Sequence, residues 1–272
     1  MKKENYLNVG CGDKFHTAWT NVDMGSNSPH VQVHNLLNGL PYGDDQFDVL
    51  YHSQVLEHFP KDKAADFLRE CFRVLKPGGI IRVAVPDLED IVNEYLRHLK
   101  ENISHPSDMS DKNYNWIMLE MYDQTVRNQT GGHMDVFLKQ PNLLNGPYIV
   151  ERVGKRSIKG NVQPTTALEK LKRVTARRLL NYVSSRLRYK FGTRASRIGA
   201  FRLGGEVHLW MYDRYSLSKL LNDVGFIHAE KLDAWRSAIE DWAAYELDVK
   251  DGAVFDPTSL FMEARKPAVS AL

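Results

Sequence analysis

Two glycines one residue apart, Gly10 and Gly12, follow a short apolar run near the start of the chain. A turn without Cβ atoms lets backbone approach a ligand closely. Asp23 ends the next apolar run, and its carboxylate can accept hydrogen bonds from two vicinal hydroxyls, as an acid after the second strand does for a ribose. Asn35 offers an amide donor and acceptor to an adenine edge, and Leu36 beside it could pack on the ring. Together these residues predict a nucleoside site.

A dinucleotide site is the competing interpretation of the glycine pair. Its fingerprint needs a third glycine three residues after the second, and an acid about 20 residues further on. Phe15 stands where the third glycine belongs, and Asp23 follows Gly12 by only eleven residues. The spacing therefore argues against a pyrophosphate cradle.

The elements that must position these residues are those of an open α/β sheet, in which ligands bind at the carboxyl ends of the strands. Apolar runs predict strands over residues 6–9, 19–22, 31–33, 47–51, 80–85, 227–232 and 260–264. The last two should form a closing antiparallel pair. Helical spacing predicts helices over residues 64–75, 113–126 and 216–224, with another opening at Val55 to His58. Gly131 and Gly132 signal a helix end beyond residue 126.

The motifs resemble those of class I S-adenosylmethionine (SAM) methyltransferases. LNVGCG, TNVDM, FDVLYHSQVLEHF and RVLKPGG occur in that order. With LWMYDRYSL and EARKP added, the pattern resembles bacterial SAM-dependent methyltransferases associated with surface polysaccharide synthesis. Asn35 departs from that pattern, which has Asp at this position. Because an amide can still accept a hydrogen bond from adenine, we expect weaker cofactor binding rather than none. The resemblance implies a Rossmann-like sheet with helices on both faces and a helical, basic insertion after the fifth strand. It also implies SAM bound by Gly10, Cys11, Gly12, Asp23, Met24, Asn35, Leu36, His52 and Ser53.

Three residues are candidates for the chemistry. Methyl transfer is an in-line displacement, so the protein mainly aligns the reactants and excludes water. A general base helps only if the acceptor must lose a proton, and His58 and His133 are suited to that task. Asp87 is the third candidate, although it fits the N-cap of a helix equally well. The stretch from His208 to Tyr212 could line one side of the acceptor site or belong to the core.

The segment from Gln54 to His58 also invites a metal interpretation. It resembles the E-x-x-E-H segment of metal-dependent methyltransferases that act on small-RNA ends and on ubiquinone precursors, where carboxylate and imidazole bind a divalent ion. Gln54 replaces the first carboxylate and so removes an anionic oxygen ligand. We therefore expect no metal, and we expect chelators to leave activity unchanged.

The long segment between the fifth strand and the closing pair should cap the acceptor. We predict a SAM-binding core in two parts, 1–102 and 206–272, and an inserted cap at 103–205. Residues 152–202 hold fifteen Lys or Arg and one acid, while the rest of the chain holds 21 bases and 33 acids. A basic helix is predicted over 166–189. This tract could dock on the acidic remainder of the chain or a second subunit, bind an anionic membrane surface or substrate, or bind nucleic acid, for which no recognition module is present.

Composition fits an enzyme with one large core and an inserted subdomain, at 272 residues with 43% hydrophobic and 26% charged. Cys11 and Cys71 form no CxxC motif, which suits a reducing cytosol. No signal region opens the chain, and no run approaches the roughly 18 apolar residues of a spanning helix. We expect a cytoplasmic protein, with peripheral contact at the inner membrane face left open.

The expected function is methyl transfer from SAM to a small-molecule or glycan acceptor, most simply a sugar hydroxyl in envelope-glycan or natural-product synthesis. An RNA methyltransferase and a non-catalytic SAM-binding scaffold are the alternatives. Release of S-adenosylhomocysteine separates an enzyme from a scaffold, and the salt dependence of RNA binding separates the two enzymes.

Overall fold

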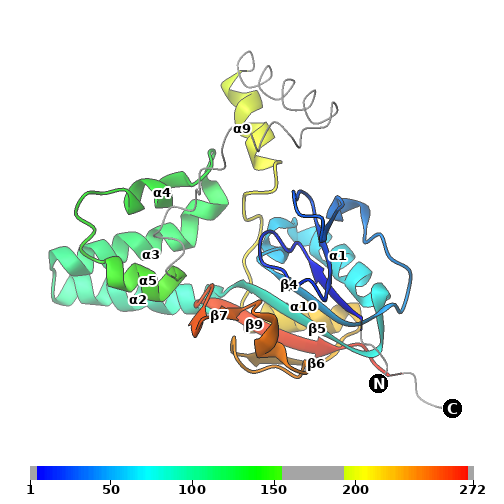
Figure 1. Ribbon diagram of the computed structural model, residues 1–272. Coiled ribbons are helices and arrows are strands. Elements are labelled where there is room, and N and C mark those ends of the chain that lie inside the picture. The colour runs from blue at the N-terminus through cyan, green and yellow to red at the C-terminus, as the bar shows by residue number, and fades with distance from the viewer. Residues whose placement is uncertain (1–4, 155–192, 269–272) are drawn as a thin grey trace.

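The computed structural model describes residues 5–154 and 193–268, and it contains a seven-stranded sheet beside a group of helices (Figure 1). The strand order is β3-β2-β1-β4-β5-β9-β6, and neighbouring strands are parallel except where β9 pairs with β5 and β6. The strands are β1 Tyr6–Val9, β2 Thr20–Asp23, β3 Val31–Val33, β4 Phe47–Ser53, β5 Leu75–Pro86, β6 Ile227–Leu232 and β9 Ser259–Arg265. The predicted α/β class and closing antiparallel pair are confirmed. The order reverses between β1 and β4, which is where such sheets bind ligands.

Both faces of the sheet are buried, and its strands alternate between them. Leu7, Leu50 and Val83 point to the face that we call the first. Two helices cover this face, α1 Lys61–Val74 and α10 Arg214–Val224. The buried residues of α1 recur at three- and four-residue spacings, which gives the helix one apolar stripe: Ala64, Phe67, Leu68, Cys71 and Val74.

The ends of α10 follow the local sequence closely. Asp213 and Ser216 form a reciprocal capping box at its start. Gly225 ends the helix in a left-handed conformation with φ of 114°, which glycine adopts at low cost. Because the helix stops there, β6 can begin at Ile227, as predicted.

The second face is covered differently from the expectation of helices on both faces. Among the described residues its cover is the segment 233–254, which contains the 3-10 turn η3 Trp242–Tyr245 and the hairpin of β7 Val249–Lys250 and β8 Ala253–Val254. The connections from β1 to β2 and from β2 to β3 form no helix. A segment far along the chain therefore supplies the apolar side chains that these connections lack, chiefly Ile239, Trp242 and Leu247.

Arg82 holds that segment against the sheet. Its fully buried guanidinium pairs with Asp248 and Glu263, each at 2.8 Å. It also donates to the carbonyl oxygens of Asp233 and Arg236 and lies over the Trp242 ring. Removing one member of such a buried group would leave charges without a partner, so the cover and the sheet depend on each other.

The helices α2 Leu88–Ser104, α3 Asp108–Val126, α4 Gly132–Leu138 and α5 Gly146–Val153 gather on one side of the sheet (Figure 1). A buried ion-pair group joins α2, α3 and α5: Arg152 of α5 contacts Glu120 of α3 at 2.7 Å and Asp90 of α2 at 2.5 Å. This residue opens the basic tract, and its charge is already used inside the protein. A further helix, α9 Arg194–Arg202, lies apart from this group at the top of the view in Figure 1.

Several local predictions for this region were wrong. The helix α3 ends at its C-cap Arg127, and Gly131 is instead the left-handed N-cap of α4. Ser107 is the N-cap of α3 in a capping box, and α3 begins before the predicted start at residue 113. The helix α9 was not predicted. The segment from Val55 to His58 forms only the 3-10 turn η2 Leu56–His58.

The division into core and cap stays a proposal, and α2 bears on where it falls. The proposed boundary after residue 102 lies in the last turn of α2, and α2 packs along α3. We therefore propose that the boundary between core and cap lies at Asp87, just before α2 begins. No helix within residues 5–154 and 193–268 has the length and apolar character to cross a membrane. The predicted basic helix over 166–189 lies outside the described residues.

Candidate functional site

The glycine turn after β1 is tight on one side and open on the other. Gly10 has φ of 65°, and a Cβ there would lie 2.4 Å from Val55 Cγ2. Gly12 has φ of 50°, and a Cβ there would meet nothing within 4 Å. The two glycines thus differ in role. Gly10 lets the turn pack beneath the loop after β4, and Gly12 leaves space for a ligand to approach backbone.

Asp23 joins this turn to the loop after β2. Its Oδ2 accepts from the Gly12 N–H and its Oδ1 accepts from the Gly25 N–H, both at 2.9 Å. The carboxylate is half-buried at the edge of the open space over Gly12. Such a carboxylate still has lone pairs to accept from hydroxyl groups.

Two neighbours of these residues differ in what they can offer a cofactor. The thiol of Cys11 is buried, and burial, reinforced by the nearby Asp23 carboxylate, raises its pKa to about 12. Cys11 is therefore a neutral thiol, and any ligand contact would come from its backbone. Met24 is 52% exposed and can cover a bound ligand.

The adenine-side prediction is half wrong. Asn35 is exposed, and its Oδ1 caps the turn η1 Leu36–Asn38 by accepting from the Leu37 N–H at 3.0 Å. Leu36 packs in the core on the first face and so is not placed to stack on a ring. Leu37, 66% exposed, is the apolar side chain available there. The Asn35 cap sets the start of η1, and Leu36, the first residue of that turn, therefore points into the core.

His52 and Ser53, the last two residues of β4, differ in their access to a ligand. The His52 ring is fully buried on the first face against Phe67, and neither ring nitrogen has a hydrogen-bond partner in the described part of the chain. Burial lowers its pKa to about 3. The imidazole of His52 is therefore withdrawn from the cofactor site. Ser53 is half-buried at the end of the strand, and its contact with the cofactor stays a prediction.

The turn η2 carries a buried cluster of His58, Glu57 and His208. The ligand atoms of the three side chains all lie within 4.8 Å of one another. Glu57 is fully buried, and neither of its carboxylate oxygens has a hydrogen-bond partner among the described residues. Burial raises its pKa to about 8. Burial also lowers the pKa of His58, and it lowers the pKa of His208 to about 3.

The segment 207–212 brings His208 to this cluster. The N–H groups of Leu209 and Trp210 donate to the Glu57 carbonyl at 2.7 and 3.2 Å, and the Leu88 N–H donates to the Tyr212 carbonyl at 2.9 Å. The segment thus crosses the ends of β4 and β5. Its meeting with Glu57 was missed from sequence, because 150 residues separate the two histidines and only folding brings them together.

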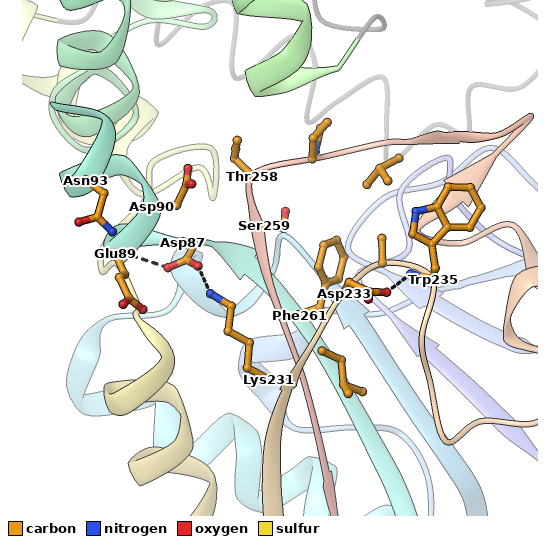
Figure 2. Close-up of a pocket in the computed structure, with 14 residues that line it drawn as sticks. Asp87, Glu89, Asp90, Asn93, Lys231, Asp233, Trp235, Thr258, Ser259 and Phe261 are labelled. Atoms are coloured by element: carbon orange, nitrogen blue, oxygen red, sulfur yellow. Dashed lines mark hydrogen bonds and ion pairs between the residues drawn. The ribbon is translucent and has the colours of Figure 1, made fainter. Parts of the chain in front are cut away.

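Asp87 is the N-cap of α2, which is one of the two roles that the sequence analysis gave it. Its Oδ1 accepts from the Glu89 N–H at 3.0 Å, and its Oδ2 pairs with Lys231 at 2.8 Å (Figure 2). Both oxygens have partners, which favours a structural role over that of a base. Asp87 nevertheless forms part of the wall of a cavity of about 430 Å³ at the ends of β5 and β6.

The lining of this cavity is acidic and aromatic. Figure 2 shows Trp235 and Asp233 on one side, with Glu89, Asp90 and Asn93 of α2 on the other. Ser259 also lines it, and Ser259 Oγ accepts from Gln54 Nε2 at 3.0 Å. This hydrogen bond connects the cavity wall to the mouth of β4.

His133 is not brought to the other candidate residues. It is exposed in the first turn of α4 and lines a separate cavity whose walls come only from residues 108–140. Figure 1 places α4 among the helices beside the sheet. His133 thus lines a different cavity from Asp87, and its role as a base stays an untested prediction.

Comparisons with known proteins agree with the motifs in the first third of the chain. Residues 7–83 match the family model described as "Methyltransferase domain". A protein of Mycolicibacterium smegmatis, described as a probable S-adenosylmethionine-dependent methyltransferase, is 43% identical over 60 residues, which are 22% of this chain and 23% of that protein. The chain thus spans under a quarter of that relative's length.

Solved structures of similar proteins cover more of the chain at lower identity. A SAM-dependent methyltransferase from Methanosarcina mazei is 13% identical, covering 98% of this chain and 94% of that one, with a TM-score of 0.41. One from Archaeoglobus fulgidus is 11% identical, covering 97% and 87%, with a TM-score of 0.38. Residues 7–83, which hold the glycine turn and Asp23, are therefore the part of the chain that is similar to methyltransferase domains.

Proposed function

We propose that the protein transfers a methyl group from SAM to a small polar acceptor, with a sugar hydroxyl in envelope-glycan or natural-product synthesis as the favoured acceptor. One observation carries the proposal. The open space over Gly12 lies beside the Asp23 carboxylate, at the point where the strand order reverses.

The residues around that space fit the cofactor. When bound, SAM supplies a methyl carbon activated by its sulfonium. Gly12 permits close approach of a ligand to backbone, and Asp23 accepts hydrogen bonds from ribose hydroxyls while it keeps its two N–H donors. The amide of Asn35 and the exposed Leu37 side chain form the adenine side. No pyrophosphate cradle is needed.

The cavity at the ends of β5 and β6 supports a sugar as the acceptor. Its volume of about 430 Å³ is in the range of small-molecule sites. Carboxylates of Glu89, Asp90 and Asp233 can accept from several hydroxyl groups, and Trp235, 53% exposed, offers a flat apolar face to the C–H bonds of a sugar ring. The protein's part in the reaction is to align the acceptor and exclude water.

The same lining opposes the RNA alternative. Four acids and one lysine line the cavity, whereas a polyanion needs phosphate contacts from Lys and Arg. The proposal assigns no general base to His58, because His58 does not line this cavity and lies in the buried cluster with Glu57 and His208. We also propose a cytoplasmic location, with the tract 152–202 as a surface for self-association or for an anionic membrane.

Acceptor screening tests this function. Purified protein is incubated with SAM and a panel of nucleotide sugars and glycan fragments, and S-adenosylhomocysteine release is measured with the mass of the product. We expect release with a sugar acceptor, and we expect Trp235→Ala to raise the KM for that acceptor while the Kd for SAM stays unchanged. Salt-sensitive release with RNA alone would favour the alternative enzyme. SAM binding without release from any acceptor would favour a scaffold.

A further inference from the structure

The cluster of Glu57, His58 and His208 is incomplete as it stands. It combines one carboxylate and two imidazoles whose ligand atoms lie within 4.8 Å of one another. The Glu57 oxygens are fully enclosed without a hydrogen-bond partner in residues 5–154 and 193–268. An ionised carboxylate enclosed in this way needs a counter-charge or a donor, whereas a protonated one does not. A cation bound here would supply the counter-charge that an ionised Glu57 lacks within residues 5–154 and 193–268.

The contacts of the two histidines leave His58 with a ring nitrogen that can bind a metal and hold His208 beside it. His58 Nδ1 lies 3.2 Å from the Val207 carbonyl oxygen, which can only accept, so Nδ1 carries the proton and the lone pair is at Nε2. A second-shell carbonyl of this kind fixes the tautomer of metal-binding histidines. The His208 ring lies edge-on to His58, with the ring centroids 4.9 Å apart. The backbone hydrogen bonds from Leu209 and Trp210 to the Glu57 carbonyl hold the two ligand-bearing segments together.

No nearby side chain in the described residues supplies the missing positive charge to Glu57. Arg127 lies near enough to help lower the pKa of both histidines. Its Nη2 donates to the Glu206 carbonyl at 3.1 Å, and its Nη1 lies 3.8 Å from the Glu206 carboxylate. Glu206 thus offsets the charge of Arg127, which would otherwise oppose a bound cation.

We propose that Glu57, His58 and His208 bind one divalent transition-metal ion of the Zn²⁺ class. Two imidazoles and a carboxylate match the ligand set of zinc sites that keep an open position, whereas Mg²⁺ and Ca²⁺ prefer oxygen ligands alone. Metal–ligand bonds of about 2.0–2.1 Å place tetrahedral ligand atoms about 3.3 Å from one another. The ligand atoms now lie within 4.8 Å of one another, so they need to approach by at most about 1.5 Å when the metal binds.

This site replaces two expectations from the sequence. The absence of a metal was inferred from Gln54, but its amide donates to Ser259, and His208 supplies a third ligand that the sequence pattern did not reveal. His58, considered above as a base, becomes a ligand instead. The binding itself does not depend on methyl transfer.

Metal binding is tested on the untagged full-length chain after chelation and dialysis. Calorimetry with Zn²⁺ should give one site per chain, and Co²⁺ should give the visible absorption of a four-coordinate nitrogen and oxygen site. Mg²⁺ should not compete. We expect His208→Ala to weaken Zn²⁺ binding at least about 100-fold, more than the loss of a second-shell partner. The matched control His133→Ala removes an exposed imidazole and should bind as wild type.

Glu57→Gln keeps the test decisive if the histidine variant misfolds. It removes the carboxylate ligand but keeps the shape of the side chain, so the metal-free protein should fold as wild type does. The rise in melting temperature that Zn²⁺ gives wild type should disappear. The proposal is overturned if wild type binds no metal after folding is verified, or if both variants and the control bind Zn²⁺ with equal affinity and number. Neither result bears on SAM binding, which is measured separately.

Discussion

At the scale of single residues, burial decides which polar side chains near the strand ends can meet a ligand. Gly12 and Asp23 remain open, while Leu36 and His52 turn into the core on the first face. His52 is the extreme case, because both of its ring nitrogens are enclosed without a partner among the described residues. His52 therefore affects the stability of the fold and the way in which that stability changes with pH.

We predict that His52 makes the fold sensitive to acid. The pKa of His52 falls from 6.5 in the unfolded chain to about 3 in the folded protein. Between those values the unfolded state binds a proton that the folded state does not, so the free energy of unfolding drops by about 1.4 kcal/mol per pH unit as pH falls. Above pH 6.5 this loss is absent.

Urea denaturation of wild type and His52→Leu across this pH range measures the effect. The variant should match or exceed wild type at neutral pH, because a polar group without partners is removed. Its free energy of unfolding should fall less steeply below pH 6.5. Parallel pH profiles for the two proteins would assign the acid sensitivity to other groups.

At the scale of elements, the second face of the sheet depends on one ion-pair group. Arg82 joins β5 to β9 through Glu263 and to the cover segment through Asp248. Tyr51 on β4 adds a hydrogen bond to Asp248 at 2.6 Å. The segment 233–254 is therefore attached by buried charge as well as by its apolar side chains.

We predict that Arg82→Met lowers the free energy of unfolding by about 3–5 kcal/mol, because it leaves two buried carboxylates without their cation. Chemical denaturation monitored by tryptophan fluorescence measures this, since Trp242 lies against Arg82. Arg69→Met, which removes an exposed pair with Asp66, should change stability by no more than about 0.5 kcal/mol. Equal effects of the two substitutions would contradict the assigned role of Arg82.

Much of the element order was predictable, because local sequence determines it. The bounds of β1 and β6 and the stop at Gly225 match the prediction, since short apolar runs and a glycine cap act within a few residues. The cover of the second face was not predictable, because Ile239 and Trp242 reach the sheet only through tertiary packing. The orientation of Leu36 and the meeting of His208 with Glu57 depend on folding in the same way.

At the scale of the whole molecule, charge is unevenly distributed along the chain. Residues 152–202 hold fifteen bases and one acid, against 21 bases and 33 acids elsewhere. Arg152, the first of these bases, pairs inside the protein with Glu120 and Asp90. Arg152 is therefore not available to a partner outside the protein.

We predict that replacing Arg173, Arg177 and Arg178 together with Gln changes the sedimentation coefficient of the protein at low salt. Wild type should approach the variant at high salt, where the Debye length falls to about 3 Å at 1 M. Analytical ultracentrifugation measures both effects. Unchanged sedimentation, together with loss of binding to vesicles of anionic lipid, would instead identify a membrane surface as the partner.

The central claim is that Gly12 and Asp23 form the cofactor site, and titration calorimetry with S-adenosylhomocysteine tests it most directly. We predict that Asp23→Ala weakens binding by about 1–3 kcal/mol, the range for polar groups left without a partner. Asp223→Ala, which removes an exposed carboxylate on α10, should bind as wild type. Thermal unfolding of each variant separates a loss of binding from a loss of folding. Undiminished affinity in a folded Asp23→Ala protein would contradict the account.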